Sequence, residues 1–156
     1  MFYRKVQVLG TPLHTPIYLH TSFRYNALMA NPKKVLVVDD ESSLVQLCQI
    51  VLENAGFKTW GAYNGKQALK LLDDEVPDLI LLDVMMPGMN GIELCREIRT
   101  NYEAKQPLIV MYTADSSDTT RKFSLEAGAN DLITKEIPIY DLPGRINEFL
   151  QPEKSG

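Results

Sequence analysis

Five short strand-like runs alternate with stretches of helical periodicity, and this alternation limits the fold more than any other feature. The runs lie at Val35–Val38, Lys58–Ala62, Leu79–Asp83, Leu108–Thr113 and Asp131–Thr134. The first run is apolar without interruption, which is typical of a parallel strand buried on both faces of a sheet. Five strand–helix units joined by right-handed crossovers therefore predict an α/β fold, a doubly wound parallel sheet with five helices on its two faces.

Apolar residues at helical spacing follow each run and predict the five helices. The segments are expected at about 44–55, 64–72, 92–98, 118–127 and 142–150. Asn64, with Gln67 three residues further on, is typical of a capping box at the start of the second helix. Gly56 and Gly128 are expected to end the first and fourth helices.

The chain has 156 residues, enough for one domain with little left for a second. Pro12, Pro16 and Pro32 interrupt the first part of the chain, where no strand or helix period persists. We expect residues 1–32 to be an extension, 33–151 to form the domain and 152–156 to be a tail. Met29 offers an alternative start, which would leave residues 1–28 outside the working protein.

Charge and hydropathy exclude several classes of function. The total charge is −4 and residues 1–28 carry +3, so the remainder carries −7. An acidic body argues against binding of nucleic acid, which requires clustered Lys and Arg. No stretch approaches the roughly 18 apolar residues of a membrane span. Cys48 and Cys95 are expected to be buried free thiols, as in a reducing compartment, and we expect a cytoplasmic protein.

Side chains that can bind a metal ion or a phosphoryl group lie at the ends of four of the expected strands. They are Asp39, Asp40, Asp83, Thr113 and Lys135. In doubly wound sheets, ligands bind beyond the carboxyl ends of the strands. If the first and third strands are neighbours, the three carboxylates converge, and an all-oxygen cluster suits Mg²⁺. Thr113 and Lys135 could then contact a phosphoryl oxygen.

Simpler interpretations exist for each of these residues alone. The acids could merely cap helix N-termini, where negative charge is favourable. Thr113 could be a β-favouring residue at a strand end, and Lys135 a solvated surface group. Helix capping does not account for Thr113 and Lys135 at two further strand ends, so the set as a whole predicts a site.

The chain from about Lys33 to Leu150 resembles the receiver domain of two-component response regulators. The motifs that carry the resemblance are VLVVDDE at Val35–Glu41, PDLILLDVMMPGMNG at Pro77–Gly91, YTA at Tyr112–Ala114 and GANDLITK at Gly128–Lys135. The resemblance implies a flavodoxin-like fold with strand order 2-1-3-4-5. It also implies that Asp83 is the phosphoacceptor, Asp40 a direct Mg²⁺ ligand and Asp39 a ligand mainly through water. Met85 would give its backbone carbonyl to the metal.

The resemblance further implies that Thr113 and Lys135 grip the phosphoryl group, which a sensor histidine kinase or histidine phosphotransfer protein supplies. Such a protein is not an enzyme beyond its own phosphorylation and dephosphorylation. It would bind an effector through the face made by the fourth helix, fifth strand and fifth helix. Because the sequence ends six residues beyond Leu150, we expect a stand-alone regulator. A phosphorelay intermediate that passes its phosphoryl group to a phosphotransfer histidine is the alternative.

Two rival classes fit the residues less well. A Mg²⁺-dependent phosphohydrolase with an aspartyl nucleophile would need an acid where this chain has Met85. A nucleotide- or flavin-binding module would need a glycine-rich loop after the first strand, where Asp39 and Asp40 would repel phosphates.

The chain departs from the family pattern at two positions near the site. Leu132 stands where an aromatic ring is usual, three residues before the lysine, and a ring-flip readout is therefore not expected. Glu136 replaces the usual proline after the lysine, which predicts a trans peptide bond there. Asp115, two residues after Thr113, could orient a water that attacks the phosphoryl group, whereas apolar Met85 could exclude one.

Overall fold

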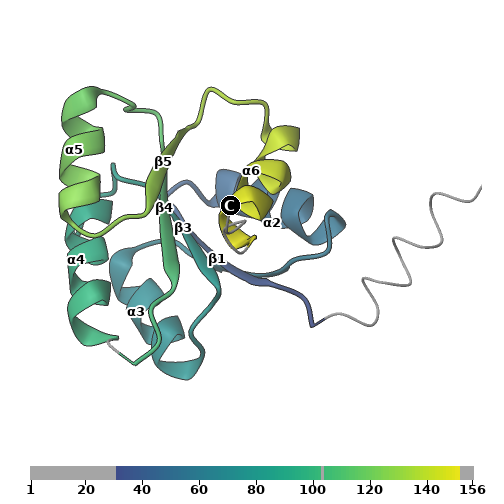
Figure 1. The fold of residues 1–156 in the computed structure, drawn as a ribbon, viewed down its shortest axis with the longest axis horizontal. Coiled ribbons are helices and arrows are strands. Elements are labelled where there is room, and N and C mark those ends of the chain that lie inside the picture. Colours follow the sequence, from purple (N-terminus) through teal and green to yellow (C-terminus); the bar gives the residue numbers. More distant parts are fainter. Residues whose placement is uncertain (1–30, 103, 152–156) are drawn as a thin grey trace, which may run out of the picture. The chain divides into compact units, whose positions relative to one another are not determined.

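The computed structural model describes residues 31–102 and 104–151, in which five parallel strands form one sheet of order β2-β1-β3-β4-β5 (Figure 1). The strands are β1 (Lys34–Val38), β2 (Lys58–Ala62), β3 (Leu79–Leu82), β4 (Leu108–Thr113) and β5 (Asp131–Thr134). The predicted fold class and strand order are confirmed. Residues 1–30 of the predicted extension, and the predicted tail at 152–156, lie outside the described residues.

Helices cover both faces of the sheet. Figure 1 shows α3, α4 and α5 on one side and α2 and α6 on the other. Their bounds are α2 (Ser42–Asn54), α3 (Gly65–Asp74), α4 (Gly91–Asn101), α5 (Asp118–Glu126) and α6 (Leu142–Leu150), with a 3₁₀ turn η1 (Ile139–Asp141) before α6. No helix in residues 31–102 and 104–151 is long and apolar enough to cross a membrane.

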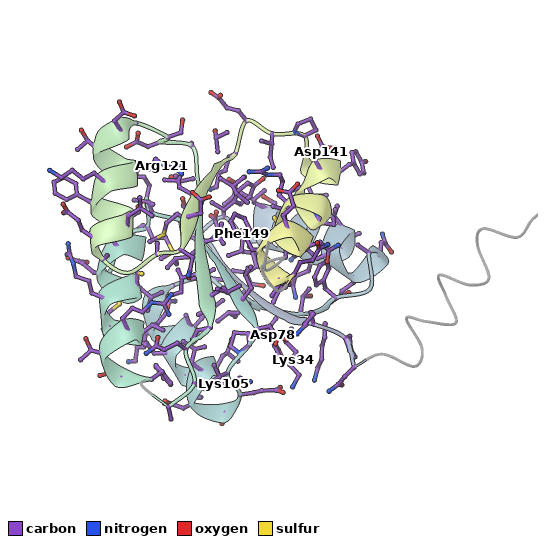
Figure 2. The ribbon with its side chains drawn as sticks, viewed as in Figure 1. Lys34, Asp78, Lys105, Arg121, Asp141 and Phe149 are labelled. Atoms are coloured by element: carbon purple, nitrogen blue, oxygen red, sulfur yellow. The ribbon has the colours of Figure 1, made fainter. Side chains whose placement is uncertain are left out.

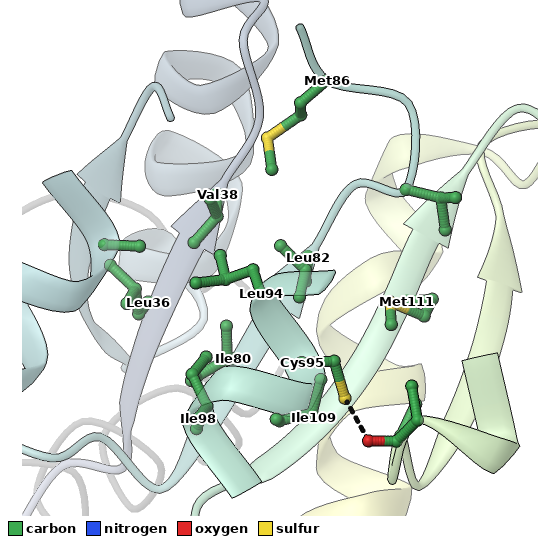
Figure 3. Packing of buried hydrophobic residues seen from close by; sticks show 14 of the residues in the cluster. Leu36, Val38, Ile80, Leu82, Met86, Leu94, Cys95, Ile98, Ile109 and Met111 are labelled. Carbon is green, nitrogen blue, oxygen red and sulfur yellow. Dashed lines mark hydrogen bonds between the residues drawn. The ribbon is translucent and has the colours of Figure 1, made fainter. Parts of the chain in front are cut away.

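Each face of the sheet has its own apolar core, because successive side chains of a strand point to opposite faces. In β1, Leu36 and Val38 pack under α3 and α4, whereas Val35 and Val37 pack under α2 and α6. Figure 3 shows the first of these cores, in which the Cys95 thiol donates a hydrogen bond to the carbonyl of Ala127. Both described cysteines are free and buried, as predicted.

The predicted helix boundaries are close to those observed. Gly56 and Gly128 end α2 and α5 with φ of 96° and 100°, a backbone conformation that glycine adopts without strain. Asn64 caps α3 by accepting from the Gln67 N–H. A capping box would also have the Gln67 side chain accept from the Asn64 N–H. It accepts instead from the N–H of Tyr63, one residue earlier, so this second hydrogen bond of the predicted box is wrong.

The register brings the carboxyl ends of the central strands to one edge of the sheet. Val38 pairs with Leu82 in β3, and the next N–H, that of Asp83, donates to the Val38 carbonyl at 2.9 Å. On the other side, the Lys135 N–H donates to the Thr113 carbonyl, also at 2.9 Å. Lys34 and Asp78 mark the opposite edge, where the Lys34 N–H donates to the Asp78 carboxylate (Figure 2).

Candidate functional site

Three carboxylates meet where β1 and β3 end. One oxygen from each of Asp39, Asp40 and Asp83 lies within 4.8 Å of the others. Asp39 and Asp83 are 3% and 5% exposed, whereas Asp40 is exposed to solvent. The predicted convergence therefore occurs, with two buried acids and one at the mouth of the site.

Lys135 reaches the two buried acids from the end of β5. Its ammonium lies 2.6 Å from Asp39 Oδ2 and 3.4 Å from Asp83 Oδ2. Burial lowers the pKa of Lys135, but the hydrogen bond to Asp39 and the charge of Asp83 outweigh it, so the pKa lies above its ordinary value. Lys135 is thus a paired cation of the site and not a solvated surface group.

The pKa of Asp83 is raised above its ordinary value. Burial is the main cause and the charge of Asp39 adds to it, while Lys135 and the Met85 N–H oppose both. One ammonium does not offset the charge of three carboxylates, and a bound cation would relieve the remaining repulsion. The cluster offers only oxygen ligands, with the exposed Asp40 leaving space for water, and these features fit Mg²⁺.

Gly91 shapes the loop that carries Asp83. A Cβ at this position would lie 2.0 Å from the Asp83 carbonyl oxygen and 3.0 Å from the Val84 Cα. Only glycine lets the start of α4 approach the backbone of the site this closely. The Gly91 N–H donates to the Val84 carbonyl, and Asn90 and Glu93 form a complete capping box behind it. The sequence marked this loop as glycine- and proline-rich but did not single out Gly91.

Thr113 is fully buried at the end of β4, and its hydroxyl oxygen accepts from the Asp115 N–H at 3.3 Å. The Asp115 carboxylate in turn accepts from the Thr120 hydroxyl at 2.5 Å and from the Ser117 N–H at 3.0 Å. These hydrogen bonds lower the pKa of Asp115. Each carboxylate oxygen of Asp115 thus already accepts one hydrogen bond from the loop or from α5, and the water-orienting role stays a prediction.

Thr120 and Ser117 were missed by sequence reasoning. Ser117 carries a recognisable signal, because it stands directly before a helical segment and its side chain caps α5 by accepting from the Thr120 N–H. Thr120 carries none, since a single threonine on a helix gives no indication of its partner.

A groove of about 590 Å³ opens beside the carboxylates, between the loop after β3 and the start of α5. Its walls include Asp40, Met85, Ile92 and Thr120. Met85 is 67% exposed, so its side chain stands at the mouth of the site.

The two departures from the family pattern are placed as follows. Leu132 is 8% exposed and belongs to the apolar core on the face of the sheet that α3, α4 and α5 cover. The peptide bond between Lys135 and Glu136 is trans, as predicted.

Comparison with known proteins agrees with this geometry. The family model of the response regulator receiver domain matches residues 35–147. A receiver domain protein (CheY-like) from Methanospirillum hungatei JF-1 is 29% identical, with a TM-score of 0.70, over 77% of this chain and 94% of that one. The receiver domain of Klebsiella pneumoniae RstA is 33% identical, with a TM-score of 0.70, over 77% of this chain and 100% of that one. The chemotaxis protein CheY4 of Vibrio cholerae is 29% identical, with a TM-score of 0.71, over 76% of this chain and 98% of that one.

Proposed function

The chain belongs to the response regulator receiver domain family, and on this premise we propose that it accepts a phosphoryl group on Asp83. The convergence of Asp39, Asp40 and Asp83 beside the Lys135 ammonium is the observation that carries the proposal. A receiver implies a histidine kinase as partner, and the family performs no turnover beyond its own phosphorylation and dephosphorylation. The donor would be a sensor histidine kinase or a histidine phosphotransfer protein.

The side chains divide the chemistry as follows. An Asp83 carboxylate oxygen attacks the phosphorus of a phosphohistidine whose other ring nitrogen carries a proton. The O–P bond of an acyl phosphate forms as the P–N bond breaks, and the histidine leaves as a neutral imidazole that keeps that proton. Lys135, already 3.4 Å from Asp83, offsets negative charge on the transferred group. The Thr113 hydroxyl turns toward one phosphoryl oxygen and donates to it.

Mg²⁺ would be held by Asp39, Asp40 and Asp83 and by the backbone carbonyl of Met85. When bound, it would supply positive charge that lowers the repulsion between the carboxylates and the phosphoryl oxygens. The burial of Asp39 and Asp83 favours such a role, because charges interact more strongly where water is scarce.

Labelling with a small phosphodonor tests the proposal. The full chain is incubated with Mg²⁺ and acetyl phosphate, and intact mass is measured before and after treatment with hydroxylamine, which cleaves acyl phosphates. We expect one phosphoryl group on the parent and on Asp141→Asn, a control at an exposed carboxylate. Asp83→Asn should remain unlabelled. An unlabelled parent, or equal labelling of Asp83→Asn, would contradict the proposal.

For the output, we propose phosphorylation-dependent binding of an effector protein through the face made by α5, β5 and α6. Exposed apolar and aromatic side chains support this, since Phe123 and Leu125 of α5 are about half exposed and Tyr140 of η1, the turn directly before α6, is 83% exposed. Adding a histidine phosphotransfer protein to the labelled chain separates effector binding from phosphorelay. Retention of label on Asp83 supports the regulator, whereas rapid transfer to the added protein supports the relay.

The domain boundaries are part of the same proposal. We place the receiver at residues 33–151, with 1–32 as an extension and 152–156 as a tail. The described strands and helices, which run from Lys34 at the start of β1 to Leu150 at the end of α6, support this division.

A further inference from the structure

The Thr113 hydroxyl is connected to helix α5 through one residue. The Asp115 N–H donates to Thr113 Oγ1, and the Asp115 carboxylate holds the first turn of α5 through the Thr120 hydroxyl and the Ser117 N–H. These bonds form a continuous path from the end of β4 to the start of α5. The path lies beside the site and contains none of the proposed metal ligands.

Apolar packing holds helix α5 only weakly, so a change in these hydrogen bonds can shift the helix. Its buried residues are Thr120 and Ser124, while Phe123 and Leu125 are about half exposed. The buried Ser124 hydroxyl has no hydrogen-bond partner among the described residues. A helix with a small, polar buried face has little apolar area to resist a shift, and an unpaired buried hydroxyl adds a cost in this position.

Leu132 strengthens the case for a separate route. An aromatic ring at this position could rotate when the threonine moves. Leu132 is a buried aliphatic side chain without a polar group, so it cannot form a hydrogen bond that changes with Thr113. Tyr112 belongs to the core on the other face of the sheet from Leu132. The Asp115 hydrogen bonds are the described polar connection between Thr113 and α5.

We propose that Asp115 and Thr120 form the link through which movement of Thr113 is transmitted to α5. This rests on the proposed phosphorylation of Asp83: when the Thr113 hydroxyl turns toward the phosphoryl group, the Asp115 N–H follows or loses its acceptor. The carboxylate of Asp115 then shifts the first turn of α5. Asp115 is thus a positioning residue that acts through Thr113 and Thr120.

A pair of matched variants tests the link in the resting chain. Thr120→Val removes the hydroxyl at nearly constant shape, and Thr120→Ser retains it. We expect hydrogen exchange at the Asp115 and Arg121 amides to be about tenfold faster in Thr120→Val than in the parent, the effect of losing a hydrogen bond to a charged group. Thr120→Ser should match the parent. Equal exchange in all three proteins would overturn the link, and this arm requires no phosphorylation.

The second arm measures transmission with Mg²⁺ and beryllofluoride, the phosphoryl mimic named in the solved structures of two similar receivers. Amide chemical shifts at Asp83 and Val84 report binding, and those at Arg121 and Leu125 report α5. In Thr120→Val we expect normal shifts at the site and less than half of the parent's shift in α5, with recovery in Thr120→Ser. A full α5 shift in Thr120→Val would overturn the link. Absence of shifts at the site in the parent would instead count against the proposed function.

Discussion

At the scale of single residues, the site combines excess negative charge with burial. Asp83 is almost inaccessible, stands near another buried carboxylate, and shares one ammonium with it. This arrangement is costly in the resting chain, and a bound cation would offset the cost by bringing compensating charge.

Asp83→Asn should therefore stabilise the chain in Mg²⁺-free buffer at pH 7. The pKa of Asp83 is raised in the folded state, so its ionised form carries a penalty at neutral pH that disappears as the pH falls through that raised pKa. Two unit charges about 5 Å apart repel by a few kcal/mol at an effective dielectric constant of 20, and Lys135 offsets part of this. We expect a gain of roughly 1–2 kcal/mol in the free energy of unfolding.

Urea titrations at a series of pH values measure this effect. The difference from the parent should shrink as the pH falls and vanish below 3.8, the ordinary pKa, where Asp83 is protonated in both states. Asp141→Asn, at an exposed carboxylate, is the control for removal of a single negative charge. A less stable Asp83→Asn at pH 7 would show that the carboxylate is net favourable in the resting site.

At the scale of elements, α4 fixes the loop that carries Asp83, the proposed phosphoacceptor. The capping box of Asn90 and Glu93 starts the helix, and Gly91 allows that start to contact the Asp83 backbone. The order of elements and most of their bounds could be predicted, because apolar periodicity and glycine or asparagine caps are local signals. The close approach at Gly91 could not, since it depends on where two segments meet in space.

Gly91→Ala should destabilise the chain and disturb the site. Its Cβ would lie 2.0 Å from the Asp83 carbonyl oxygen, and backbone atoms cannot rotate away as a side chain can. We expect a loss of about 3 kcal/mol or more, together with slower labelling of Asp83 by acetyl phosphate.

Gly144→Ala in α6 is the matched control, because a Cβ there meets nothing within 4 Å. It should gain about 0.5–1 kcal/mol from helix propensity alone. Thermal and urea denaturation measure both variants. A Gly91→Ala protein as stable as the parent would mean that the start of α4 moves aside at little cost.

At the scale of the whole molecule, one parallel sheet separates two apolar cores and brings all proposed site residues to its carboxyl edge. Within residues 31–102 and 104–151, which the structure describes, both cores and all five strands lie between Lys34 and Leu150. The proposed domain at 33–151 therefore contains the elements that a stable receiver requires.

A chain that starts at Met29 should fold and be labelled as the full chain is. We expect the same midpoint of thermal unfolding, the same rise in that midpoint on adding Mg²⁺, and the same extent of labelling on Asp83. Differential scanning calorimetry and intact mass measure the three quantities. A lower midpoint, or a smaller response to Mg²⁺, would assign a stabilising role to residues 1–28.

The sequence by itself determined the order of the elements and the candidate site, because strand ends and the chemistry of their side chains are visible along the chain. Only the tertiary structure decided which groups these side chains contact. The Lys135 ammonium lies closer to Asp39, 96 residues away in the sequence, than to Asp83. The Asp115 carboxylate accepts a hydrogen bond from the Thr120 hydroxyl. The physical reason is that periodicity specifies which face a side chain occupies, whereas packing specifies which group it meets there.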